Sequence, residues 1–232
     1  MRRVICARAA DGGPFDVTSP DIRRNSRTMM FHRILAVLFA LCVPSFAAEP
    51  DQADYFPMNP GDEHTMTVAM TNAKGQTEKM IAHRKIEAEA GKVSVEKNGK
   101  TYLRLRTWMD GGPLSVKHTR LIRKDDQGLH SVADERGNAA EQLEVPMPLK
   151  PGNSWKYEDN GMIHTASVIA IETVIVGERK FENCFHIRSE TVGGTFREDF
   201  WEAPKVGTVK SEIAYSNGVR ITLTFREFKP GK

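Results

Sequence analysis

The sequence is poor in cysteine. Of its three cysteines, two lie in the first 48 residues, and Cys184 is the only one beyond them. If the first 47 residues are removed as a signal peptide, the remaining chain cannot form an intramolecular disulfide. Its hydrophobic core must then hold the fold. Cys184 is either buried or paired between chains. Burial is the expected state, because free cysteine is among the most buried residue types.

The chain beyond residue 48 also lacks excess positive charge. The formal net charge is +3, but residues 1–48 hold seven of the 33 Lys and Arg and three of the 30 Asp and Glu. The remainder therefore has 26 basic and 27 acidic residues, a net charge of −1. Without a basic patch to neutralise phosphates, this part is not expected to bind nucleic acid.

No apolar run is long enough to cross a bilayer as a helix, which takes about twenty residues. The run at 34–43 has ten residues and follows the short basic segment 30–33. Pro44 ends it, and Ser45 and Ala47 are the small residues of a cleavage site. Residues 30–48 are therefore predicted to be a helical bacterial signal peptide, cleaved near Ala47 and leaving no transmembrane span; an uncleaved anchor or a buried helix is the alternative.

The predicted signal places the mature protein in the periplasm or outside the cell. Residues 1–29 are polar and lack periodicity. We expect them to be a disordered extension that results from a start codon assigned too far upstream. The alternative is a genuine long basic region of the signal.

Beyond the signal, apolar and polar residues alternate over many short stretches, which is the pattern of strands with one buried face. The pattern predicts twelve strands, at 64–71, 78–88, 92–97, 101–109, 114–124, 128–133, 154–158, 162–176, 184–191, 195–201, 207–215 and 219–228. The segment 78–90 also has a composition that suits a short helix. Without crossover helices a parallel sheet is excluded, so the sequence predicts an all-β fold. One strongly curved antiparallel sheet, or one in each half of the chain, is favoured over a barrel or a sandwich.

Asparagine–glycine pairs mark the predicted hairpins. Asn217-Gly218 stands between the last two strands and predicts a two-residue type I′ turn, which needs positive φ at both residues. Asn98-Gly99 and Asn160-Gly161 give the same signal.

The chain carries an internal repetition. The pattern apolar-Pro-apolar-x-Pro-Gly occurs at 56–61 and again at 147–152, and a strand is predicted after each copy. Two further correspondences follow in the same order. They predict two tandem units of about ninety residues, 49–145 and 146–232; chance similarity between β-hairpins is the alternative.

Three stretches resemble a widespread group of uncharacterised secreted bacterial β-rich proteins, namely 55–58, 151–157 and 201–212. The hallmarks of that group are a Phe-Pro-Leu-x-x-Gly-x-x-Trp start and a Trp-x-Ala-Pro-Gly-Val-Gly-x-Val-Lys strand. The chain departs at Lys205, where the group prefers Gly, and at His64, where the first unit lacks the tryptophan. The resemblance implies an extracytoplasmic location and a curved sheet, similar more distantly to the half-barrels that carry lipoproteins through the periplasm. It implies no reaction.

No catalytic motif is recognisable. Glu198 and Glu202 are expected on one face of a strand and Asp199 on the other. With Arg197 and Lys205 nearby, a solvated, salt-bridged face is the simpler interpretation, and a hydrolase using these carboxylates is the least favoured function.

No metal or cofactor is expected either. Cys184 and His186 share a strand face, a spacing that soft metal ligands can use. A structural zinc site needs four ligands, however, and the sequence offers no second pair at short spacing.

The aromatic residues suggest where a ligand would bind. We expect the candidate ligand-binding residues on a concave sheet face to be Trp155, Tyr157, Phe200 and Trp201; a packed core without a cavity is the alternative. The favoured function is a non-enzymatic extracytoplasmic module that binds an apolar or amphipathic ligand or an envelope component. A structural or protein-interaction module with exposed strand edges such as 128–133 is the alternative.

Overall fold

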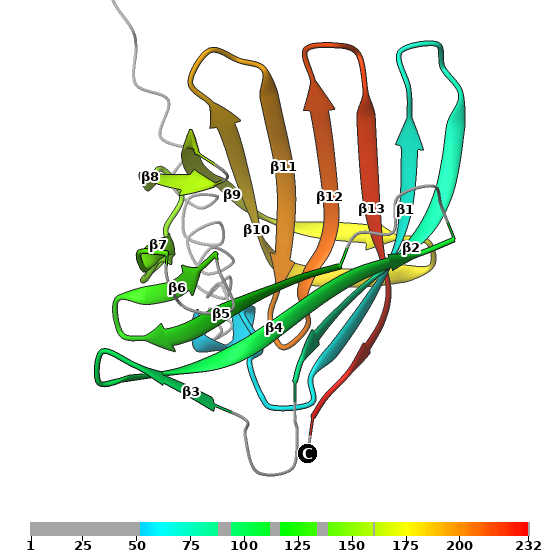
Figure 1. The fold of residues 1–232 in the computed structure, drawn as a ribbon. Coiled ribbons are helices and arrows are strands. Elements are labelled where there is room, and N and C mark those ends of the chain that lie inside the picture. The colour runs from blue at the N-terminus through cyan, green and yellow to red at the C-terminus, as the bar shows by residue number, and fades with distance from the viewer. Residues whose placement is uncertain (1–51, 88–93, 112–116, 134–138, 160, 232) are drawn as a thin grey trace, which may run out of the picture. The chain divides into compact units, whose positions relative to one another are not determined.

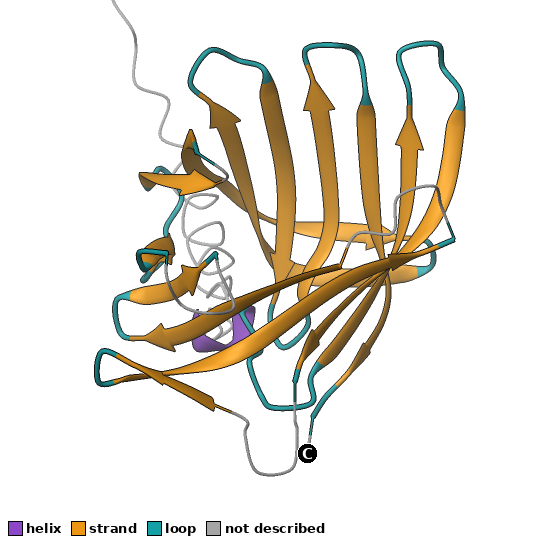
Figure 2. Ribbon diagram, viewed as in Figure 1, coloured by secondary structure: helices purple, strands orange, loops and turns teal. Residues whose placement is uncertain are grey.

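Antiparallel strands make up almost all of the chain that the structure, a computed structural model, describes: residues 52–87, 94–111, 117–133, 139–159 and 161–231. The other element of these ranges is the short 3₁₀ turn η2 (Gln52–Tyr55) (Figure 2). The predicted all-β antiparallel fold is confirmed. The described residues contain no helix long and apolar enough to span a membrane.

Thirteen strands belong to one sheet. They are β1 (Glu63–Thr71), β2 (Thr77–Ile86), β3 (Ser94–Lys97), β4 (Lys100–Asp110), β5 (Lys117–Asp125), β6 (Gly128–Val132), β7 (Gln142–Pro146), β8 (Ser154–Asp159), β9 (Met162–Val176), β10 (Arg179–Thr191), β11 (Phe196–Ala203), β12 (Gly207–Tyr215) and β13 (Arg220–Lys229). Twelve follow the order β7-β6-β5-β4-β2-β1-β13-β12-β11-β10-β9-β8, and β3 pairs only with β4.

This sheet curls until its two ends approach each other, so it forms a nearly closed barrel (Figure 1). The end strands β7 and β8 are joined by side chains. The Trp155 indole nitrogen donates to the Glu144 carbonyl oxygen at 2.7 Å, and the Glu158 amide donates to Gln142 Oε1 at 3.0 Å. The predicted strong curvature is confirmed, although the sheet comes closer to a barrel than expected.

The two predicted units contribute contiguous halves of the sheet, β1–β7 and β8–β13, which join where β1 pairs with β13. A meander in each half does not by itself test duplication, which stays a prediction. The predicted signal helix, its cleavage site and the 1–29 extension lie outside the described residues, as does Asn160.

Several strand predictions need correction. Residues 78–86 lie in strand β2 and so do not form the helix considered for 78–90, whose last three residues lie outside the described ranges. Strand β10 begins at Arg179 rather than at 184. The twelve predicted strands do not include β7, because its apolar–polar alternation is only five residues long. With β7 in place, β6 is paired on both sides and wholly buried, so 128–133 is not an exposed edge.

One of the predicted type I′ turns is confirmed and another is wrong. Asn98 and Gly99 both have positive φ, at 51° and 70°. The loop between β12 and β13 has four residues instead of two, because the Tyr215 amide donates to the Val219 carbonyl oxygen at 2.9 Å. Within that loop Gly218 has a positive φ, while the Asn217 side chain accepts from the Val219 amide at 3.1 Å, as in an Asx-turn.

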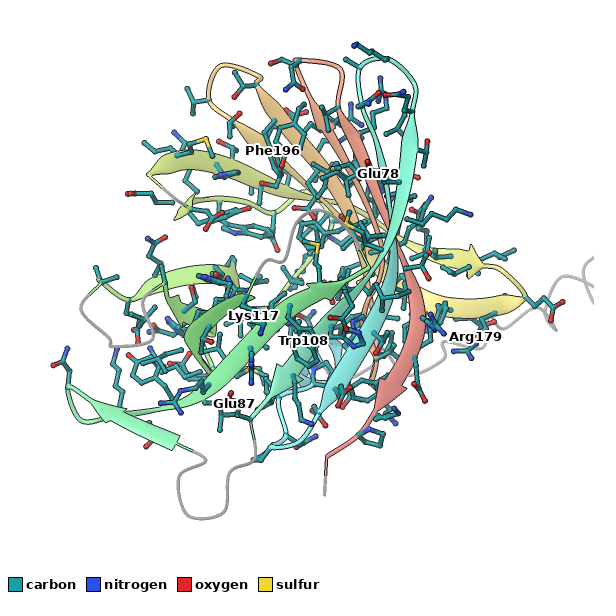
Figure 3. All side chains as sticks on the ribbon, turned by 45° about the vertical axis from the view of Figure 1, so that its right-hand side comes forward. Glu78, Glu87, Trp108, Lys117, Arg179 and Phe196 are labelled. Carbon is teal, nitrogen blue, oxygen red and sulfur yellow. The ribbon has the colours of Figure 1, made fainter. Side chains whose placement is uncertain are left out.

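The long β9–β10 hairpin reaches beyond β8 and crosses other strands of the sheet (Figure 1). It packs through Val174 and Cys184 against Trp201 and Val209. The ring of Phe225 on β13 also belongs to this contact, since it lies 5.2 Å from the Phe181 ring. Arg179 marks the far end of the hairpin in Figure 3.

A second cluster fills part of the barrel interior and holds η2 in place. It contains Phe185 and Ile187 of β10 with Tyr55, whose ring lies 4.5 Å from that of Phe185. The Tyr55 hydroxyl donates to the Asn183 carbonyl oxygen at 2.7 Å, and the side-chain nitrogen of Gln52 donates to the Leu149 carbonyl oxygen at 2.7 Å. These contacts position the segment that follows η2 beside the cavity described next.

Candidate ligand-binding cavity

The barrel interior contains a cavity of about 260 Å³ that is partly open to solvent. It is lined by Phe56, Arg84, Arg120, Leu129, Glu144, Val145, Trp155, Tyr157, Asp159, Ala166, Glu198, Phe200, Glu202 and Thr208. A smaller, mainly apolar hollow of about 40 Å³ adjoins it. The two share five lining residues, which are Phe56, Arg84, Leu129, Glu202 and Thr208.

Three of the four predicted ligand-binding aromatic residues line this cavity together: Trp155, Tyr157 and Phe200. The Tyr157 hydroxyl shares a 2.9 Å hydrogen bond with Ser189 Oγ, and its ring stacks on His164 at 5.0 Å. Burial raises the pKa of Tyr157 to about 12. Tyr157 is therefore held as a neutral phenol with its ring fixed beside the cavity.

The fourth predicted residue, Trp201, is on the opposite face of β11. It stacks on His186 with ring centroids 4.5 Å apart, and its indole nitrogen donates to Glu172 Oε1 at 2.5 Å. The β9–β10 hairpin covers it. Trp201 therefore belongs to the core beneath the hairpin and does not line the cavity.

Two carboxylates of β11 point into the cavity, where sequence reasoning expected a solvated face. Glu202 is only 4% exposed, and Thr208 Oγ1 donates to it at 2.6 Å. Glu198 accepts from Ser211 Oγ at 2.7 Å. Burial raises the pKa of both carboxyl groups, that of Glu202 to about 7. The expectation of a solvated face is wrong for these two residues, because this side of β11 faces the barrel interior.

Asp199, between them, is salt-bridged as expected, but it is buried at 7% exposure and not solvated. It lies on the other side of β11, where its carboxylate contacts Arg188 and Arg197 at 2.8 Å each. His186 Nε2 lies 2.9 Å from the same carboxylate. The predicted division of the three acids between two faces is confirmed.

The two interior arginines differ in their partners. Arg120 Nη1 lies 2.5 Å from Glu144 Oε1, which also accepts from Ser131 Oγ at 2.7 Å. Arg84, opposite His64 in the β1–β2 register, lines both the cavity and the smaller hollow. Its guanidinium makes no ion pair or hydrogen bond with the described part of the chain. Burial, and then the positive charge of Arg120, lower the pKa of Arg84, so its cationic form is poorly stabilised.

His64 is a second interior group with an unmet polar atom. Its Nε2 is buried without a hydrogen-bond partner, and its ring lies 5.5 Å from that of Phe225 and 6.3 Å from that of Phe228. Burial, followed by the positive charge of Arg84, lowers its pKa to about 4. His64 is therefore neutral at physiological pH.

Cys184 is fully buried, as predicted, and burial raises the pKa of its thiol to about 11. Its neighbour His186 is held between Asp199 and Glu172, whose carboxylate oxygens lie 2.9 and 3.3 Å away. Over the described ranges, no group of three or more His, Cys, Asp or Glu side chains is arranged to hold a metal ion.

Sequence reasoning missed Arg84, although a signal was present. Met80, Ala82 and Ile86 are buried and alternate with more exposed residues along β2. Arg84 occupies the same face of this alternation, which places it inside. The cavity thus combines aromatic surface with two arginines, of which Arg84 is unpaired among the described residues, and four carboxyl groups, a lining that suits an amphipathic molecule.

Comparisons with known proteins give little guidance. No family model and no curated protein matches the sequence. A candidate exported protein with a YmcC-like fold from Bacteroides fragilis has a TM-score of 0.47 at 15% identity, over 75% of this chain and 98% of its own. A candidate lipoprotein from Parabacteroides distasonis has a TM-score of 0.42 at 12% identity, with the same coverage. A β-barrel-like protein of domain of unknown function DUF1849 from Brucella abortus has a TM-score of 0.38 at 9% identity, over 76% of this chain and 100% of its own.

Proposed function

We propose that this protein is a non-enzymatic, extracytoplasmic module that binds an amphipathic ligand inside its barrel. The observation that carries the proposal is the cavity of about 260 Å³ lined by Phe56, Trp155 and Phe200 on one hand and by Arg84 and Glu202 on the other. Small-molecule sites are concave, about 300–1,000 Å³ in volume, and combine apolar walls with a few polar groups. A purely apolar ligand would leave these charged groups without water or partners, so an amphipathic one fits better.

The extracytoplasmic location is supported by the signal-like pattern of residues 30–48. An exported carrier would take up its ligand in the envelope. The ligand should therefore accompany the protein when it is purified gently from the envelope fraction of bacteria that express the full sequence. Native mass spectrometry tests this. Extra mass that is lost on denaturation and extracts into organic solvent is the expected result, and a bare protein mass would count against the proposal.

A second function, strand addition by a partner protein, is favoured by one observation at β9. Strand β8 pairs with β9 only as far as Ser167, and no other described strand covers the rest of that edge. Ile169, Ile171 and Ile175 on this stretch are 43%, 39% and 70% exposed. An apolar strand with a free edge is a template for an added strand.

Site-specific crosslinking in intact cells distinguishes this second function. A photoreactive amino acid replaces Ile175, and the matched control places it at the equally exposed Val192, in the turn after β10. A discrete crosslinked protein at 175 and none at 192 is expected. The same pattern of products at both positions would refute strand addition at this edge.

A further inference from the structure

Arg84 stands where the two parts of the interior space meet. It lines the main cavity with Trp155 and Phe200, and it lines the smaller apolar hollow with Ile86 and Phe228. A molecule that occupied either part would reach its guanidinium. This position sets Arg84 apart from Arg120, which lines the main cavity alone.

The two acids whose charge acts on Arg84, Glu144 and Glu202, are already engaged. Glu144 is held by Arg120 at 2.5 Å and by Ser131 at 2.7 Å. Glu202 accepts from Thr208 at 2.6 Å, and no contact within ion-pair distance connects it to Arg84. A partly buried guanidinium without a paired anion is costly, so a site that retains one has an unmet requirement for an anion.

We propose that Arg84 binds the carboxylate head of an amphipathic acid whose apolar part lies against the aromatic wall of the cavity. The proposal rests on the function proposed above and names its ligand class. A guanidinium presents two parallel N–H groups that match a carboxylate, which gives direction as well as charge to the contact. Phe56, Trp155 and Phe200 supply apolar surface within the same cavity.

A singly charged head is favoured over a phosphate dianion or an amine. The cavity is already lined by the carboxyl groups of Glu144, Asp159, Glu198 and Glu202, and their combined potential opposes a second negative charge. An amine would find carboxyl groups that already accept hydroxyl hydrogen bonds, and it would lie beside Arg84 and Arg120. A monoanion neutralises Arg84 and adds no excess negative charge to the cavity.

The test compares three probes with the same chain and different heads: octanoate, 1-octanol and octylamine. Each is titrated by calorimetry into delipidated full-length protein and into the variants Arg84→Gln, Arg84→Lys and Arg226→Gln. Arg226 is the matched control, because it is an exposed arginine on β13. Thermal unfolding of each variant verifies that it is folded.

Octanoate should bind the wild type more tightly than the other probes do. Arg84→Gln should weaken octanoate binding roughly ten- to hundred-fold, the effect of losing a charge-assisted contact, and leave 1-octanol nearly unchanged. Arg84→Lys keeps the charge but loses the paired N–H groups, so its loss should be intermediate. It also keeps the test decisive if Arg84→Gln does not fold. Arg226→Gln should bind all three probes as the wild type does.

The possible failures are distinguishable. Equal octanoate affinity in the wild type and the Arg84 variants, or tighter binding of octylamine than of octanoate, would overturn the acid assignment. If 1-octanol still binds in that case, the proposed ligand-binding function survives. If none of the three probes binds the wild type, both proposals fail.

Discussion

Arg84 on β2 and Glu202 on β11 face the same interior space, yet no ion pair joins these two described side chains. They come from opposite halves of the sheet, which meet at the β1–β13 pair. Arg84 has no paired anion among the described residues, and burial disfavours the charged form of Glu202. Groups of this kind are common at functional sites, where stability is sacrificed for binding.

The first prediction concerns the stability of the ligand-free protein. Arg84→Met should raise the free energy of unfolding by about 1 kcal/mol, because it removes a partly buried charge that has no partner and keeps an apolar side chain. Urea denaturation of delipidated protein measures this, with Arg226→Gln as the surface control. A clear loss of stability in Arg84→Met would mean that the fold depends on the charge.

The second prediction concerns Glu202 and the change in stability between pH 4.5 and 7. Burial raises the pKa of this carboxyl group from 4.5 to about 7 in the folded protein. Between these values the folded state holds a proton that the unfolded state has lost, so the free energy of unfolding falls as the pH rises from 4.5 through 7. The loss is at most about 3 kcal/mol. Glu202→Gln should flatten this part of the profile in urea titrations, and an unchanged slope would contradict the burial of this group.

The third prediction concerns His64 and has the opposite sign. Burial lowers the pKa of this imidazole from 6.5 to about 4, so between these values the unfolded state binds a proton that the folded state does not. The free energy of unfolding should therefore fall as the pH drops from 6.5 to 4, by up to about 3 kcal/mol. His64→Phe places an apolar ring beside Phe225 and Phe228 and should remove this loss. A wild-type slope in the variant would show that His64 does not titrate in this way.

The extent to which sequence anticipates this cavity can be traced along two strands. Alternation along β11 correctly separates Glu198, Phe200 and Glu202 from Asp199 and Trp201. It does not say which side faces the barrel interior, because that depends on the β1–β13 pairing between strands far apart in sequence. The same alternation places Arg84 on the apolar side of β2.

Two other features depend on contacts that no local pattern encodes. The cover over Trp201 exists because β9 and β10 are longer than their neighbours and fold across the sheet. Strand β7 is stabilised by its antiparallel pairing with β6. Its own five residues give a pattern too short to predict a strand.

The fourth prediction uses Cys184 to probe the hairpin cover. Its thiol is buried, and burial raises its pKa to about 11, so little reactive thiolate is accessible in the native state. Native protein treated with iodoacetamide at neutral pH and analysed by peptide mass mapping should show Cys184 unmodified. Treatment in urea should show it alkylated. Peptide mapping separates this signal from that of the two N-terminal cysteines, and rapid native modification would mean that the hairpin opens freely.

Ligand occupancy of the cavity can be tested most directly by filling the cavity. Ala166 on β9 is 1% exposed and lines the cavity, so Ala166→Phe places a ring in the space proposed for the ligand. Ile169→Phe places the same ring at an exposed position on the same strand. Native mass spectrometry of the three proteins, purified alike from the envelope fraction, should show ligand mass in the wild type and Ile169→Phe and none in folded Ala166→Phe. Equal ligand mass in all three would show that whatever binds does so outside the barrel.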